Sequence, residues 1–139
     1  MKGDIGVIGL AVMGQNLILN MNDHGFKVVA HNRTAAKVDE FLEGQAKGTN
    51  IIGAYSLEEL VEKLETPRKV MLMVRAGDVV DKFIDALVPL LDKGDIIIDG
   101  GLNQKYDERV IGPGSWIALD NMVYRQHGAL EKRNGYGAL

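Results

Sequence analysis

The sequence predicts an α/β fold, a parallel sheet with helices on both faces, from three observations. Runs rich in β-branched residues alternate along the chain with segments whose apolar residues recur at the spacing of a helix face. The strands predicted at 69–74 and 95–99 are almost continuously apolar, which is typical of a parallel sheet covered on both sides. The first strand also ends in a glycine-rich turn that opens directly into a helix.

The first two strand–helix units are marked by a glycine and by a capping residue. Residues 4–9 form a β-branched strand that ends in glycine, and a helix is predicted over 14–24. Gly25 follows where a helix-terminating glycine sits. Residues 27–31 are the second strand, and Thr34 then stands where it can cap a helix that runs to about residue 42.

The next units continue the same alternation. Residues 51–52 predict a weak third strand, and the capping-box sequence that starts at Ser56 predicts a helix to about residue 64. The apolar strand at 69–74 comes next. A helix is predicted over 78–91, with a distortion at Pro89 in its last turn.

Residue 101 is expected to be a domain boundary. The fifth strand, at 95–99, is followed by two glycines, after which clear periodicity is lost. We expect residues 1–101 to form the sheet domain and residues 102–139 to be a divergent tail that is partly disordered or completes the sheet. Within the tail, residues 110–119 could form two short strands about a Gly-Pro-Gly turn.

The composition excludes several classes of protein. The 139 residues carry a net charge of −3, without the concentrated basic face that nucleic-acid binding needs. The absence of cysteine excludes a disulfide scaffold and a thiolate zinc site, and the histidines lack metal-ligand spacing, so we expect no metal. The apolar runs are too short to span a bilayer, and the first residues show no signal-peptide pattern. We therefore expect a cytoplasmic protein that binds neither nucleic acid nor membrane.

The turn after the first strand carries the residues that point to chemistry. It reads Gly9-Leu10-Ala11-Val12-Met13-Gly14, the dinucleotide-binding fingerprint with alanine in place of its middle glycine. Gly9 allows the tight turn, the small Ala11 lets the backbone approach a pyrophosphate, and Gly14 permits close packing of helix on strand. The helix N-terminus then directs its N–H groups at the anion. The strand–turn–helix context predicts a Rossmann-like dinucleotide site, the alternative being a glycine-rich turn without a ligand.

The end of the second strand indicates which dinucleotide is bound. An acidic residue there would accept a hydrogen bond from a ribose 2′-hydroxyl and indicate NAD. This chain has Asn32, Arg33 and Thr34 instead, and a guanidinium can form a charge-assisted fork with a 2′-phosphate. We therefore predict NADP, the alternative being a solvated loop arginine. Arg75, in Val74-Arg75-Ala76 after the fourth strand, is expected beside the same cleft, facing phosphate, nicotinamide or simply solvent.

These motifs resemble those of the 6-phosphogluconate dehydrogenase family. The resemblance covers residues 4–101 and is carried by four stretches: 8–20, His31-Asn32-Arg33-Thr34, 67–74 with Ala76-Gly77, and 88–91 leading into 93–101. It implies that Gly9–Gly14 hold the pyrophosphate of NADP, that Asn32–Thr34 hold its 2′-phosphate ribose, and that Val74–Ala76 lie on the nicotinamide side. After the Gly-Gly pair the family has an asparagine that contacts cofactor and sugar acid. Here Leu102 stands in that place, and Asn103, one position later, is the candidate for the contact.

The resemblance also implies an activity for the complete enzyme. It is the NADP-dependent oxidative decarboxylation of 6-phosphogluconate to ribulose 5-phosphate in the pentose phosphate pathway, carried out by a homodimer. The family's catalytic lysine and glutamate belong to a helical domain, and no position of this sequence matches their motifs, so no catalytic residue is predicted. We expect a truncated or frame-changed product that is inactive alone. Two alternatives are a β-hydroxyacid dehydrogenase or imine reductase relative, and a non-catalytic nucleotide-binding or interaction module.

Overall fold

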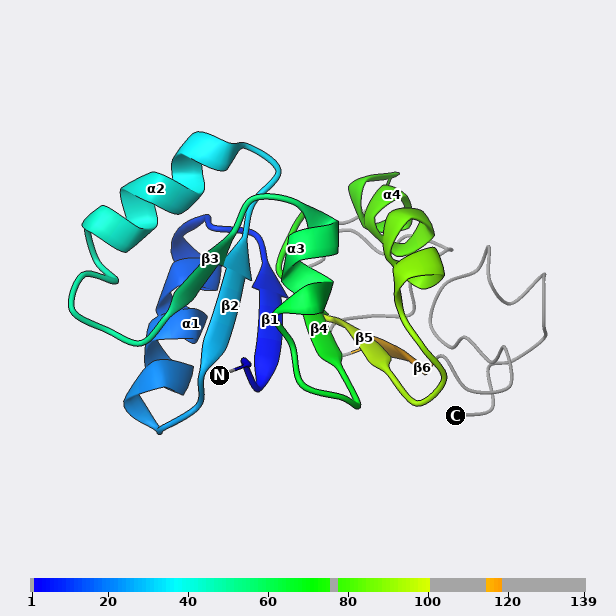
Figure 1. The fold of residues 1–139 in the computed structure, drawn as a ribbon. Coiled ribbons are helices and arrows are strands. Elements are labelled where there is room, and N and C mark those ends of the chain that lie inside the picture. The colour runs from blue at the N-terminus through cyan, green and yellow to red at the C-terminus, as the bar shows by residue number, and fades with distance from the viewer. Residues whose placement is uncertain (1, 76–77, 101–114, 119–139) are drawn as a thin grey trace.

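The computed structural model describes residues 2–75, 78–100 and 115–118. They form a six-stranded sheet with helices on both faces (Figure 1). The strands are β1 (Ile5–Ile8), β2 (Val28–His31), β3 (Ile52–Ala54), β4 (Lys69–Leu72), β5 (Ile96–Asp99) and β6 (Ser115–Ala118). The helices are α1 (Val12–Asp23), α2 (Ala35–Glu43), α3 (Leu57–Glu62), α4 (Asp78–Leu87) and the 3-10 helix η1 (Val88–Leu90).

The strand order across the sheet is β3-β2-β1-β4-β5-β6, and the first five strands are parallel. This confirms the predicted parallel sheet. The sixth strand is antiparallel to β5, with Ser115 opposite Asp99 and Ala118 opposite Ile96. It lies within the segment 110–119 for which short strands were one expectation. Because β1 and β4 are neighbours while the chain leaves them toward opposite edges, their carboxyl ends form the switch point at which such sheets bind ligands.

Buried apolar side chains form two layers, one on each face of the sheet, between the sheet and the helices that cover it. The layer beneath α1 and α2 is built from Val7, Leu10, Ile18, Val28, Ala30, Val38, Phe41, Ala46 and Ile51. The layer beneath α3 and α4 includes Ile8, Val29, Leu60, Leu64, Val70, Leu72, Val80, Phe83, Ile84, Leu87 and Ile97. Successive residues of β1 and β2 alternate between the two layers because side chains along a strand point to opposite faces. Both faces are therefore covered, as the continuously apolar strands predicted.

The helix ends agree only in part with the sequence predictions. Thr34 is the N-cap residue of α2, but its side chain makes no capping hydrogen bond. Ser56 does cap α3, since its Oγ accepts a hydrogen bond from the N–H of Glu59 at 3.0 Å. The carboxylate of Glu59 reaches back to the N–H of Tyr55 at 2.7 Å, one residue before the position of a standard capping box. The helix predicted to reach residue 91 ends at Leu87 and continues as η1, because Pro89 cannot donate to an α-helical hydrogen bond.

A buried ion pair joins the start of β4 to the loop before β5. Asp95 is only 1% exposed, and its carboxylate accepts hydrogen bonds from the backbone N–H and the Nη1 of Arg68, at 2.6 and 3.1 Å. It also accepts the N–H of Asp92 at 2.8 Å, and Arg68 donates from Nε to the carbonyl of Val61 at 3.1 Å. The Arg68–Asp95 pair thus links α3, the start of β4 and the loop before β5 at the amino end of the sheet.

Candidate functional site

The glycine turn after β1 is closed against β4 so tightly that two of its positions have no room for a side chain. Gly9 has a φ of +116°, and a Cβ built on it would overlap the carbonyl of Met73. A Cβ on Gly14 would overlap the carbonyl oxygen of Gly9 itself. Hydrogen bonds from Gly9 N–H to the carbonyl of His31, at 2.9 Å, and from Met73 N–H to that of Ile8, at 2.7 Å, fix the turn between β2 and β4. The two glycines therefore allow the turn to close against Met73 and against the start of α1.

The N-terminus of α1 is left open above this turn. Its N-cap residue is Ala11, which has no side-chain capping hydrogen bond, and the first turn of the helix contains no acidic residue. Val12 and Met13 are 72% and 50% exposed, so the start of the helix faces solvent. The N–H groups at the start of a helix carry a partial positive charge and need an acceptor. A pyrophosphate is an acceptor of the size and charge that such a glycine-lined helix start binds.

Asn32 has a role that the sequence did not reveal. Its Oδ1 accepts the N–H of Leu10 at 3.0 Å, and its Nδ2 donates to the carbonyl of Thr34 at 3.2 Å. The side chain thus ties the glycine turn to the loop after β2. Gln15, which sequence reasoning missed, holds the same turn from α1 by donating from Nε2 to the carbonyl of Leu10 at 2.8 Å. Asn32 therefore positions the two loops of the site relative to each other.

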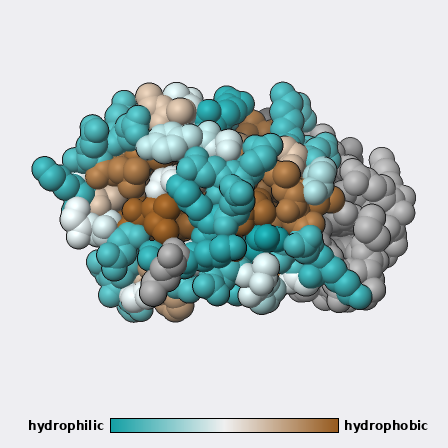
Figure 2. Space-filling view, in the orientation of Figure 1, coloured by the Kyte–Doolittle hydropathy of each residue, from teal (hydrophilic) through white to brown (hydrophobic). Residues whose placement is uncertain are grey.

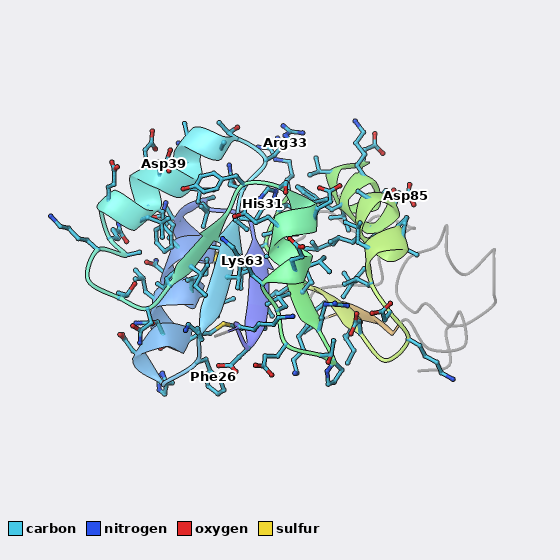
Figure 3. All side chains as sticks on the ribbon, in the orientation of Figure 1. Phe26, His31, Arg33, Asp39, Lys63 and Asp85 are labelled. Atoms are coloured by element: carbon cyan, nitrogen blue, oxygen red, sulfur yellow. The ribbon has the colours of Figure 1, made fainter. Side chains whose placement is uncertain are left out.

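A cationic groove lies where β2 and β4 end. It has a volume of about 290 Å³ and is lined by Asn32, Arg33, Thr34, Val74, Arg75, Val79 and Phe83. Figure 3 shows Arg33 at this end of the molecule, beyond the carboxyl end of β2. The structure thus brings Arg75 and Val74, predicted on the nicotinamide side, into the same groove as Asn32–Thr34. The predicted residues Ala76 and Asn103 lie outside the described residues.

Three side chains near the carboxyl end of β3 are held by charge and hydrogen bonds. Tyr55 donates its hydroxyl to Asp39 at 2.6 Å, and this hydrogen bond raises the pKa of the tyrosine. The hydrogen bond from Lys63 at 2.7 Å, with that from the Tyr55 N–H, lowers the pKa of Glu59. His31 is buried and its Nδ1 lies 2.9 Å from the carbonyl of Ala54, so it joins β2 to β3 within the core. These contacts link α2, β2 and α3 to the end of β3.

Larger hollows lie at the opposite end of the sheet. One of about 540 Å³ and one of about 440 Å³ adjoin each other around Phe26, which Figure 3 shows far from Arg33. Their lining mixes lysines with the carboxylates of Asp4 and Glu65. Figure 2 shows the molecule in the orientation of Figure 1. The surface on this face is mostly hydrophilic, with apolar atoms exposed over α4 and beside α2. We place the functional site at the smaller groove, because it adjoins the glycine turn and the switch point of the sheet.

Within the described part of the chain, no three histidine, aspartate or glutamate side chains gather in a way that could hold a metal ion. The same residues contain no helix long and apolar enough to cross a membrane.

The parallel sheet, the closed glycine turn at its switch point and the open start of α1 define a Rossmann-type dinucleotide-binding domain. Residues 4–111 of the sequence match the protein family described as the NAD binding domain of 6-phosphogluconate dehydrogenase. The chain belongs to this family. The match reaches ten residues beyond the boundary expected at residue 101.

Individual relatives agree with the family match. The decarboxylating 6-phosphogluconate dehydrogenase of Haemophilus influenzae is 81% identical over 107 residues, which are 77% of this chain and 22% of that protein. The human protein of the same name is 66% identical over 105 residues, 76% of this chain and 22% of its own length. Among solved structures, Plasmodium falciparum 6-phosphogluconate dehydrogenase is 46% identical, with a TM-score of 0.66 over 72% of this chain and 22% of that one.

The chain spans about a fifth of the length of these relatives. At such identities, the alternative assignment to the β-hydroxyacid dehydrogenases or imine reductases is not favoured.

Proposed function

We propose that this chain binds NADP, with the glycine turn holding the pyrophosphate and Arg33 holding the 2′-phosphate. The observation that carries the proposal is the groove of about 290 Å³ that joins Arg33 and Arg75 to Asn32 and Thr34 beside that turn. Two guanidinium groups with neighbouring amide and hydroxyl groups match a phosphate monoester, whereas a diol would call for a carboxylate. The Plasmodium falciparum relative was solved with its cofactor NADP+, which supports the choice.

Within the site, the roles of the fingerprint residues follow from their contacts. We expect the backbone from Gly9 to Gly14 to approach the pyrophosphate, because this turn leads into the uncapped N-terminus of α1. Leu10 and Ala11 lead into the helix, and the exposed Val12 and Met13 start it. Asn32 acts by holding the turn through the N–H of Leu10. Asn103 and Ala76 remain candidates for further contacts.

The preference for NADP over NAD tests the assignment of Arg33. Changing Arg33→Ala should weaken NADP binding by about ten- to a hundredfold, because charge-assisted hydrogen bonds are worth roughly 1.5–3 kcal/mol. NAD binding should change little, since NAD has no 2′-phosphate. Calorimetric titration of the 139-residue chain with both dinucleotides measures the two affinities.

Arg33→Lys is the matched control for this experiment. It keeps the positive charge but loses the planar fork, so the NADP preference should fall to an intermediate value. Equal affinity of the unaltered chain for NAD and NADP would show that the 2′-phosphate is not bound here.

We further propose that the chain is the cofactor-binding part of a decarboxylating 6-phosphogluconate dehydrogenase. Its relatives carry that name, and the Plasmodium falciparum structure includes a complex with 6-phosphogluconate. When bound, NADP supplies the nicotinamide that accepts a hydride. The residues of this chain bind and orient the dinucleotide, and the sugar acid is 6-phosphogluconate in the complete enzyme. The homodimer and the cytoplasmic location belong to the same proposal.

Binding without turnover is the result expected of the 139 residues alone. The groove and the glycine turn are local to the α/β sheet, so the chain should bind NADPH. Catalysis also needs a base, an acid and a clamp for the sugar phosphate, and acid–base groups contribute roughly 10²–10⁴ each. An absorbance assay of NADPH formation with 6-phosphogluconate should therefore stay at background. Steady NADP reduction by chain free of host enzyme would show that catalytic residues lie within this sequence.

A further inference from the structure

The groove at Arg33 continues into a second hollow between α3 and α4. This hollow, which we term the α3–α4 slot, has a volume of about 150 Å³ and is lined by Arg33, Leu57, Val79, Lys82, Phe83 and Ala86. Arg33, Val79 and Phe83 line both the groove and the slot. The two hollows therefore adjoin at these three side chains, and we refer to them together as the depression.

The charge of this depression is opposite to that of the chain. Among its described lining residues, Arg33, Arg75 and Lys82 are cations and none is acidic, although the whole chain carries a net charge of −3. The hollows at the other end of the sheet contain carboxylates as well as lysines. Positive charge is thus gathered at the end of the sheet where the proposed 2′-phosphate binds.

The spacing of residues along α4 explains why Lys82 faces the slot. Val79, Lys82, Phe83 and Ala86 stand at positions i, i+3, i+4 and i+7, which form one stripe of a helix. Phe83 is buried and anchors the stripe, while Lys82 is exposed at its rim.

The acidic residues of α4 lie outside this stripe. Asp78, Asp81 and Asp85 do not line the slot, and none of them is without an interaction partner. In the view of Figure 3, Asp85 lies on the side of α4 turned away from Arg33. The Lys82 ammonium is therefore the charge that α4 presents to the slot.

We propose that Lys82 is a further specificity-determining residue for NADP, acting on the 2′-phosphate from the α4 side of the slot. This inference rests on the proposed binding of NADP at Arg33 and deepens it. Lys82 acts through solvent at the rim of the depression, so its contribution is smaller than that of a direct guanidinium–phosphate contact. For the same reason the contribution is sensitive to ionic strength, since salt screens exposed charges over about 10 Å at 0.1 M.

The test compares Lys82→Gln with Lys27→Gln in the 139-residue chain. Both changes remove one lysine charge, but Lys27 lines the hollow next to Phe26 at the far end of the sheet. Affinities for NADP and NAD are measured by calorimetry in low salt and again in high salt. In low salt, Lys82→Gln should weaken NADP binding by about two- to fivefold and leave NAD binding unchanged, an effect that high salt should remove. Lys27→Gln should change neither affinity, and Lys82→Arg should keep the preference for NADP.

Two results would overturn the inference. Equal losses of NADP and NAD affinity in Lys82→Gln would show that the side chain contacts the shared part of the dinucleotide, and an unchanged NADP affinity would show that it has no role. Arg33→Ala, measured in parallel, separates this inference from the proposed function. If Arg33→Ala lowers the NADP preference and Lys82→Gln does not, the Lys82 inference fails while the binding of NADP stands.

Discussion

Replacing Gly9 by alanine should lower the free energy of unfolding by about 2–5 kcal/mol and abolish dinucleotide binding. The φ of +116° strains any L side chain, at a cost of roughly 1–2 kcal/mol. The new Cβ would also overlap the carbonyl of Met73, and forced overpacking costs typically about 1–3 kcal/mol more. The turn can accept the methyl group only by moving away from β4, which displaces the N–H groups that would face the pyrophosphate. Urea unfolding and calorimetric titration with NADPH measure the two effects.

Gly48→Ala is the matched control for this change. Gly48 also has a positive φ, +83°, but nothing lies within 4 Å of the position of its Cβ. The free energy of unfolding of Gly48→Ala should therefore fall only by the backbone strain, about 1–2 kcal/mol, and the variant should bind NADPH normally. If Gly9→Ala is no less stable than Gly48→Ala, the close approach of the glycine turn to β4 is not a constraint on this fold.

Replacing Asp95 by alanine should lower the free energy of unfolding by about 3–5 kcal/mol, because it leaves a largely buried guanidinium without its buried partner. The Asp95 side chain is 1% exposed and that of Arg68 is 15% exposed. The change also removes the acceptor of two backbone N–H groups, those of Arg68 and Asp92. Urea unfolding of the variant measures the loss. The slope of the free energy of unfolding against urea concentration should stay unchanged if the unfolding remains two-state.

Asp92→Asn provides the comparison. Asp92 also pairs with Nη1 of Arg68 at 3.1 Å, but its side chain is 75% exposed. The expected loss is therefore at most about 1 kcal/mol, as for other exposed ion pairs. Similar losses in Asp95→Ala and Asp92→Asn would mean that burial does not determine the strength of this network.

The elements of the fold could be predicted from the sequence because their signals are local. Each parallel strand is a short apolar run bounded by polar or turn residues, and each helix has its apolar residues on one face. The observed ends of the elements differ from the predicted ones by a few residues. The third strand, for example, is predicted at 51–52 and lies at Ile52–Ala54. The shift reflects pairing with β2, which sets the register of a strand and which periodicity alone does not encode.

Part of the site could be predicted in the same way. The glycine turn lies within one continuous stretch of sequence. The spacing of its glycines therefore indicates that other backbone atoms approach Gly9 and Gly14 closely. The loop after β2 could also be identified, since a dinucleotide site has its specificity residues at a fixed distance from the turn. The partners of these residues could not be predicted. Asn32 reaches Leu10 across 22 positions of sequence, and no local pattern announces that contact.

The order of strands and helices along the chain, the glycine turn and Arg33 after β2 were all predictable from the sequence, because short-range spacing and residue type specify them. Tertiary structure alone decided which distant groups meet. It placed Lys82 in a hollow with Arg33, buried Asp95 against Arg68, and set β6 antiparallel at the edge of the sheet. The physical reason is that parallel strands have their carboxyl ends at the same end of the sheet, and the strand order leaves only β1 between β2 and β4. Side chains separated by some forty residues therefore share one groove.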